Sequence, residues 1–367
     1  MIVDELDDPN AHLSPDEAHR RQRYRAPGEC LAAELGDDDV ERIVTAIDNN
    51  VPKRSLAVMA RWWQLETYLR TLVYIQLQGR FGPSLGSEFQ NEKKRLERAT
   101  EHGYMASADD GYLPSQFDVG ALLKLLADNW DQCQFGIGLP KAVWMGRVGE
   151  LVPIRHRLAH CRRPHVDDVD RIDQLLRDLE PAANNVLRSY TDWCEVDGGL
   201  ADPVVDDWVH LRHEYSHLVE HGRDRRGIDF SLRTVALPGA TLGGPAVTGS
   251  PGRFWVMHAY VREGGLYIDD YVRSVQNLMP LAAHIVQPSQ SEVAVTIAAV
   301  SDPQVPSDLI GGFLHAVFWA QGRGDDRFSV RHPSRRVRHG LDPRVDAQGI
   351  LSVLSSLNPE DRCSIFG

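Results

Sequence analysis

Arg155 and His160 are the residues of this chain whose types and spacing best suit a chemical role. They lie in the segment LVPIRHRLAHCRRPH, residues 151–165. A planar guanidinium can bind two phosphate oxygens, and an imidazole can gain or lose a proton near neutral pH. Cleavage of a phosphodiester bond without a metal ion needs a cation that stabilises developing negative charge and a group that transfers protons. The segment is therefore a candidate site for phosphodiester chemistry.

The same segment is basic within an acidic chain. Between Lys141 and His165 there are six Lys or Arg residues against one acid, whereas the 367-residue chain has a formal net charge of −12. Since nucleic-acid binding depends on neutralising phosphates, the overall charge argues against indiscriminate wrapping and leaves only a local patch. The candidate phosphate contacts in this patch are Arg157, Arg162 and Arg163.

The elements around the motif must position its side chains. The pattern predicts a helix that ends near Pro164, followed by a second helix capped by Asp167 or Asp168. Five positions on one helix turn the side chains of Arg155 and His160 by roughly 140° relative to each other, so one helix does not aim both at one atom. We therefore expect a homodimer in which the arginine of one copy meets the histidine of the other.

The segment IRHRLAHCRRP, followed by DDVDRIDQLLRDLE, resembles the signature of the HEPN superfamily. In that motif an Arg is followed by a polar residue and, after a few positions, by a His. His156 takes the polar position, where Asn is more usual. Upstream, WWQLETYLRTLVYIQLQGRFG resembles the first long helix of the family, with Glu66 and Arg70 as its supporting polar residues. The resemblance covers about residues 40–190.

The resemblance implies a dimeric helical bundle and a metal-independent endoribonuclease without a cofactor. Many members are RNA-cleaving toxins or phage-defence effectors, so RNA is the expected substrate and an antitoxin or another regulatory partner is expected as well. The 2′-hydroxyl would attack its own phosphate, leaving a cyclic phosphate and a 5′-hydroxyl. Some members bind without cutting, so a non-catalytic RNA- or protein-binding module is the first alternative.

A zinc-dependent hydrolase is the second alternative. His213, Glu214 and His217 form the pattern HEYSH, which on a helix places two imidazoles one turn apart beside a general base. The surrounding segment is polar nearly all round, and no third ligand follows at the metzincin spacing. A solvated helix from Trp208 to His221 is the simpler interpretation.

The whole chain is predicted to consist of a flexible leader, residues 1–36, an all-α HEPN-like bundle, residues 37–195, and a smaller α+β domain, residues 200–367. Strands are expected in the last part at IDFSLRTVAL, RFWVMHAYV, LYIDDYV and EVAVTIAAV, and helices at SDLIGGFLHAVFWAQG and DAQGILSVLSSL. Because the motif lies in the bundle, the α+β domain is expected to be dispensable for chemistry.

The location expected from the sequence is the cytoplasm. The first residues contain no apolar run of signal-peptide length, and no later segment approaches the length needed to span a bilayer. The five cysteines stand singly with no CxxC pair, which predicts neither a disulfide framework nor a thiolate zinc site.

Overall fold

The structure is a computed structural model that describes residues 37–101, 112–191, 202–236, 252–275, 279, 281–287, 289–299, 304–322 and 345–346. The chain divides into two compact units, Met1–Ala57 and Val58–Gly367. The predicted leader, residues 1–36, and most of the predicted helix DAQGILSVLSSL lie outside the described residues. In the first unit, α3 spans Asp37–Asn50.

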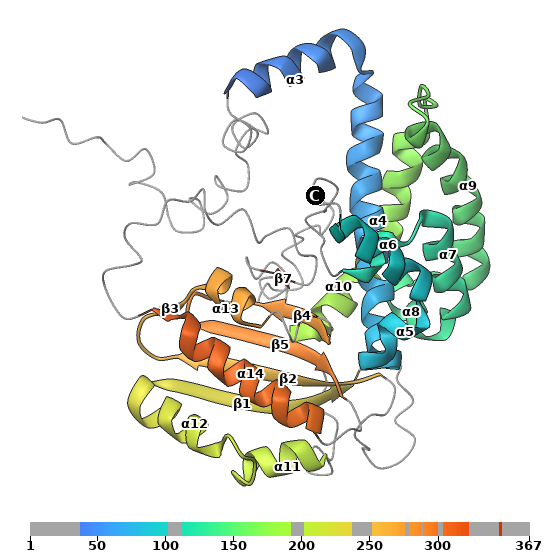
Figure 1. The fold of residues 1–367 in the computed structure, drawn as a ribbon. Helices are drawn as coiled ribbons and strands as arrows, with labels where there is room; N and C mark the ends of the chain where they lie inside the picture. Colours follow the sequence, from blue (N-terminus) through green and yellow to red (C-terminus); the bar gives the residue numbers. More distant parts are fainter. Residues whose placement is uncertain are drawn as a thin grey trace, which may run out of the picture. The chain divides into compact units, whose positions relative to one another are not determined.

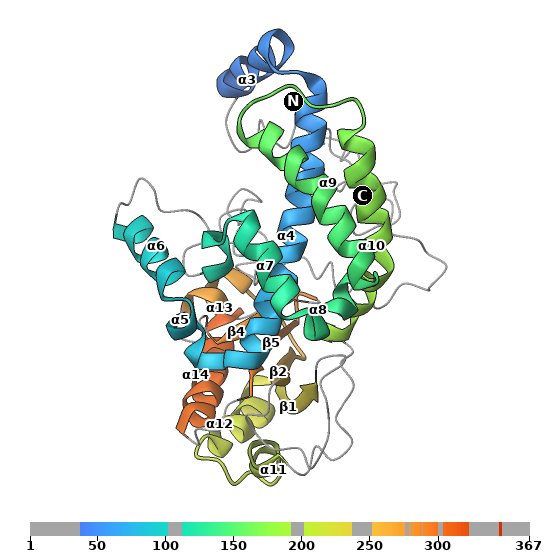
Figure 2. The same cartoon turned by 90° about the vertical axis from the view of Figure 1, so that its right-hand side faces the viewer.

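The second unit begins with helices, as predicted (Figure 1). Its long helix α4 spans Lys53–Phe81, with its first residues in the first unit. The longer helices that follow are α6 (Gln90–Glu101), α7 (Val119–Asp128), α8 (Trp130–Ile137), α9 (Lys141–Ala159) and α10 (Asp168–Thr191). Short helical pieces connect them: η1 (Gly82–Ser84), α5 (Leu85–Glu88) and η2 (Leu113–Gln116). The view in Figure 2 shows α9 and α10 side by side.

A sheet and its covering helices complete the second unit. Four antiparallel strands lie in the order β1-β2-β5-β4, and the two-residue β7 (Val345–Asp346) pairs parallel with β4. The strands are β1 (Ile228–Ala236), β2 (Arg253–Val261), β4 (Ala282–Val286) and β5 (Glu292–Ala298), and β3 (Gly265–Leu266) pairs separately with β6 (Gln321–Gly322). The helices are α11 (Pro203–Val209), α12 (Ser216–His221), η4 (Gly222–Arg226), α13 (Ile268–Ser274) and α14 (Gln304–Ala320). The predicted succession of a helical part and an α+β part is confirmed.

One predicted strand is a helix instead. LYIDDYV was expected to be extended, but only its first residue is in a strand, and α13 begins at Ile268. Tyr271, Val272 and Val275 are buried in the core shared with α14, at a spacing that places them on one helical face. The pattern of seven residues is short enough to satisfy both periods, and packing against α14 decides in favour of the helix.

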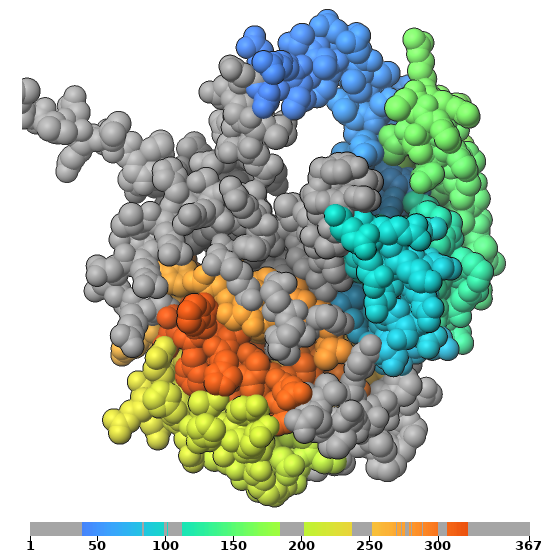
Figure 3. All heavy atoms as spheres, viewed as in Figure 1, coloured from blue at the N-terminus to red at the C-terminus, as the bar shows by residue number. Residues whose placement is uncertain are grey.

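The two faces of the sheet belong to different cores. Trp255, Met257 and Ala259 of β2 pack with α13 and α14. The ribbon shows α14 lying across the sheet (Figure 1), and the space-filling view shows the atoms of α14 at the surface on this side (Figure 3). Phe254 and Val256, which alternate with them, join the core of the helical bundle instead. The sheet therefore has helices on both faces.

Helix α4 connects the bundle to the sheet. Every residue from Leu72 to Gly79 is buried, which a helix packed on one side only would not show. The Tyr74 hydroxyl donates to the Ala282 carbonyl at 2.7 Å, and the Gly252 amide donates to the Gly79 carbonyl at 2.8 Å. A Cβ on Gly79 would lie 2.8 Å from the Phe254 ring, so glycine permits this close approach. Bundle and sheet thus share one hydrophobic cluster, which argues against a bundle that is independent of residues 200–367.

None of the described helices combines the length and the apolar character required to cross a bilayer.

Candidate functional site

The predicted site lies where α9 ends. His160 occupies the residue position directly after the helix, and Cys161 adopts a left-handed conformation with φ 51°. The Arg162 amide donates to the Arg157 carbonyl at 2.8 Å, and the Cys161 amide donates to the Leu158 carbonyl at 3.2 Å, the paired bonds of a Schellman ending. The helix end is therefore closed by the backbone, and its side chains are not needed as caps.

The candidate catalytic side chains at this end are open to solvent. His156, His160, Arg162 and Arg163 are exposed, and Arg155 is half-buried. The side chains of Arg155 and His160 make no hydrogen bond or ion pair with any described residue. Both groups are thus available to a bound ligand, and the structure does not bring them into contact with each other within one chain.

His156 and His160 are the pair that one chain does bring together. Their ring planes are parallel within 2°, and the ring centroids are 6.1 Å apart. They lie four positions apart, which is the spacing of neighbours on one helical face. The site in a single chain is therefore two adjacent imidazoles, with the guanidinium of Arg155 further round the helix.

Arg157 has a structural role. Its Nε donates to Oδ2 of Asp168 at 2.9 Å, its Nη2 donates to Oδ1, and the His165 amide donates to the same carboxylate at 2.8 Å. Burial alone would raise the pKa of Asp168, but these hydrogen bonds outweigh it and the pKa is lowered. The bidentate hydrogen bond raises the pKa of Arg157. Arg157 therefore holds the end of α9 to the start of α10, which leaves Arg162 and Arg163 as the candidate RNA contacts.

Arg157→Ala is expected to lower the free energy of unfolding by about 1–3 kcal/mol at pH 7, because it leaves the buried Asp168 carboxylate without its charged donor. A carboxylate whose pKa is lowered by folding contributes stability above its unfolded pKa, about 3.9, and loses it as the pH falls through the folded value. Urea unfolding of both proteins should thus show a difference that narrows below about pH 4. A difference that is independent of pH would assign the stabilisation to packing instead.

Glu66 and Arg70 belong to a network inside the bundle. Arg70 donates to the Glu66 carboxylate and to the Pro114 carbonyl, and Trp62 Nε1 donates to Glu66 at 2.6 Å. This network ties α4 to η2. No hydrogen bond or ion pair joins Glu66 or Arg70 to Arg155 or His160, so the structure lends no support to the expectation that Glu66 orients them.

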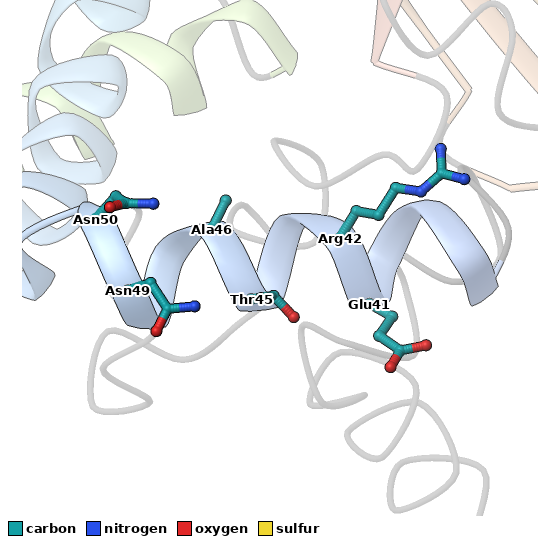
Figure 4. A pocket seen from close by; sticks show the side chains of 6 residues that line it. All are labelled: Glu41, Arg42, Thr45, Ala46, Asn49 and Asn50. Atoms are coloured by element: carbon teal, nitrogen blue, oxygen red, sulfur yellow. The ribbon is translucent and has the colours of Figure 1, made fainter.

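Two hollows among the described residues lie away from a set of converging groups at this site. A groove of about 360 Å³ between α9 and α10 is lined by residues that include Glu150, Arg157, Asp168 and Arg171. Its charges are paired within it, since Arg171 lies 3.5 Å from Glu150 and Arg157 is bound to Asp168. A second hollow, of about 590 Å³, is lined by one helix, α3, whose polar side chains point outward (Figure 4). Neither hollow contains a set of converging catalytic groups.

The HEYSH pattern does not lie on one helix, contrary to the geometry that a zinc site requires. Helix α11 ends at Val209 and α12 begins at Ser216, so His213 and Glu214 lie in the turn between them. The His213 ring stacks on Trp208 with centroids 4.9 Å apart, and the Glu214 carboxylate accepts a hydrogen bond from Ser307.

Within the described ranges, no three His, Cys, Asp or Glu side chains are grouped so that they could hold a metal ion. Burial lowers the pKa of His213, as expected for an imidazole packed against an indole. The alternative based on His213, Glu214 and His217 therefore has no geometric support.

Sequence reasoning missed a second titratable cluster, on the sheet. His258 of β2 lies opposite Ser231 of β1 and Ala294 of β5, and its Nε2 is 4.0 Å from Oε2 of Glu292. The pKa of His258 is lowered, mainly by burial. Glu292 raises this pKa and Arg233 lowers it, both by smaller amounts. These residues share a face only through the antiparallel register, which no spacing within one strand reveals.

Comparison with known proteins gives no match: no protein-family model, curated protein or solved structure is similar to the chain.

Proposed function

We propose that the chain is a metal-independent endoribonuclease of HEPN type whose active site is formed by Arg155 and His160. The observation that carries the proposal is the availability of these groups: they lie at the basic end of α9, are not used as helix caps, and make no polar contact with described side chains. The neighbouring Arg157, by contrast, is held by Asp168. Within the motif, Arg157 therefore has a structural role, whereas Arg155 and His160 are available to bind a ligand.

Each open group matches one requirement of RNA transesterification. His160 transfers a proton to or from a ribose oxygen, a contribution that is typically worth about 10²- to 10⁴-fold in rate. Arg155 stabilises the negative charge on the pentacoordinate phosphorus, as an oxyanion donor does, and Arg162 and Arg163 bind flanking phosphates. The reaction leaves a 2′,3′-cyclic phosphate and a 5′-hydroxyl and needs no metal ion.

A homodimer completes this site. Arg155 and His160 are five positions apart on one helix, so the guanidinium that meets a given His160 comes from a second copy packed antiparallel across a two-fold axis. Helix α9 has an exposed stripe suited to such packing, because its members are mostly small or apolar. They are Ala142, Met145, Gly146, Gly149, Val152, Pro153, His156 and His160.

Val152→Glu is expected to weaken the dimer by at least about tenfold in Kd, since it places a charge in the apolar part of this stripe. Val152 is exposed within the chain, so the melting temperature should change little. The matched control is Val143→Glu, which makes the same change at an exposed position of α9 away from the stripe. Light scattering at micromolar concentration distinguishes them, and a monomeric wild type would contradict the dimer.

The test of the proposed function is incubation of the purified full-length protein with total RNA in EDTA, followed by analysis of the product ends. Cleavage with cyclic phosphate and 5′-hydroxyl ends is the expected result. Binding without cleavage would favour the non-catalytic module, and cleavage that EDTA abolishes would overturn the metal-independent mechanism. A toxin or phage-defence setting, with an antitoxin or another regulatory partner, follows from the HEPN resemblance and is proposed on that ground alone.

A further inference from the structure

We infer that His156 and His160 of the same chain act as a paired general base and general acid, so that His156 is a second catalytic residue. The inference rests on the proposed ribonuclease function and deepens it. It starts from the parallel imidazoles, 6.1 Å apart between centroids, on the exposed stripe of α9. His156 follows Arg155 directly, so one helix end carries two imidazoles beside the guanidinium.

Transesterification needs two proton-transfer groups. The 2′-oxygen forms a bond to phosphorus as the bond from phosphorus to the 5′-oxygen breaks. One imidazole accepts the proton of the 2′-hydroxyl, and the other, as imidazolium, donates a proton to the departing 5′-oxygen. Base and acid have then exchanged protonation states, and exchange with solvent restores them. Charge and atoms balance without a co-reactant.

The separation of the two rings suits this task. A hydrogen bond to an oxygen spans about 2.7–3.2 Å, so a phosphodiester placed against both rings can reach a nitrogen of each. The attacking and leaving oxygens lie on opposite sides of the phosphorus, which calls for two separate groups rather than one. Arg155 of the second copy then stabilises the charge on the remaining phosphate oxygens.

Most charged groups on either side of the two imidazoles in the sequence are cations. On α9 and the following turn the neighbouring charged or titratable residues are Arg155, Arg157, Arg162, Arg163, His165 and Asp167, of which His165 and Asp167 contact each other. On α10, which packs against α9, Asp168 is paired with Arg157, and Arg171 lies 3.5 Å from Glu150. No ion pair or hydrogen bond joins either imidazole to a described side chain. No carboxylate among the described residues therefore forms an ion pair with either ring.

The experiment is the pH dependence of kcat/KM on a single-stranded oligoribonucleotide, in EDTA, between pH 5 and pH 8.5. One base and one acid give a bell-shaped profile for the wild type, because the reaction needs the base deprotonated and the acid protonated. His156→Asn is expected to lower kcat/KM by about 10²- to 10⁴-fold and to remove the pH dependence on one side of the profile. Loss of the acidic side would identify His156 as the base, and loss of the alkaline side would identify it as the acid. Added imidazole should partly restore His156→Ala.

The matched control is His165→Asn, because His165 is also an exposed histidine of this segment but lies beyond α9 and forms its ion contact with Asp167. His165→Asn should keep both the wild-type rate and the bell-shaped pH profile. If His156→Asn also keeps both, while His160→Asn is inactive, the pair is overturned and the proposed function stands. If the wild type does not cut RNA at all, the proposed function and the pair fall together.

Discussion

His160→Ala is expected to reduce RNA cleavage by about 10²- to 10⁴-fold, the range measured for loss of a positioned proton-transfer group. Arg155→Ala is expected to cost about 10²- to 10³-fold, as for removal of one oxyanion donor. Neither change should alter the melting temperature much, because neither side chain has an internal polar partner among the described residues. Initial rates on a fluorescent oligoribonucleotide, with circular-dichroism melting curves, measure both effects.

The matched control is Arg177→Ala, which removes an exposed arginine of α10 that is far from the motif in sequence and whose one hydrogen bond to a described residue is with Gln174. It should leave the rate unchanged. Full activity in His160→Ala would contradict the proposed chemistry. A large loss of stability together with retained specific activity would assign these residues a structural role.

A mixing experiment tests whether the site is shared between two copies. Arg155→Ala and His160→Ala homodimers each have two defective sites, but a heterodimer of the two has one site with both groups intact. If subunits exchange freely, the mixture should recover roughly a quarter of wild-type activity. No recovery, with exchange verified by labelled subunits, would place Arg155 and His160 of one chain in one site.

The end of α9 was predictable from the sequence because its signals are local. Pro164 and the acids after it separate two helices, and α9 and α10 do end and begin on either side of that proline. Which of Arg155 and Arg157 would form an ion pair within the chain was not predictable. Arg157 differs from Arg155 only in its direction from the helix, and the buried Asp168 that binds it lies eleven positions away across a turn.

Two predicted elements were wrong for one physical cause. A continuous polar helix was expected from Trp208 to His221, but a turn with Leu211 at φ 53° separates α11 from α12. LYIDDYV fits a strand until α14 offers a surface for one face of a helix. In both cases tertiary packing selects between local conformations that the residues alone leave nearly equal.

A fragment that ends at Thr191, the last residue of α10, is expected to lose cooperative folding. The sequence favours the opposite result, a bundle that dimerises and cuts RNA by itself, because the whole motif lies before that residue. The structure argues against independence through the shared core. Val235, Phe254, Val256, Ala283 and Ala298 of the sheet are buried in the same hydrophobic cluster as the bundle helices.

The size of the effect follows from this buried surface. Burying one large apolar side chain contributes about 1.5–3 kcal/mol, and removing the sheet exposes the part of α4 between Leu72 and Gly79 that is buried all round. Several such losses together match the total stability of an ordinary domain, about 5–15 kcal/mol. The fragment should therefore unfold without a sharp transition or aggregate, and its loss of activity would follow from loss of structure.

Phe254→Ala in the full-length protein separates the core contact from the other effects of truncation. Phe254 is fully buried beside Gly79, so its removal should lower the free energy of unfolding by about 3–5 kcal/mol. The control is Tyr260→Ala, an aromatic truncation at a partly exposed position of the same strand, which should lower the free energy of unfolding by less.

The measurement is denaturant unfolding of a variant whose single tryptophan is Trp144. Its fluorescence would report the bundle core directly, since Trp144 is fully buried in α9. If Phe254→Ala left the unfolding of the bundle unchanged, or the fragment ending at Thr191 remained folded and active, the sheet would be a dispensable attachment, and the bundle alone would contain everything that the proposed chemistry requires.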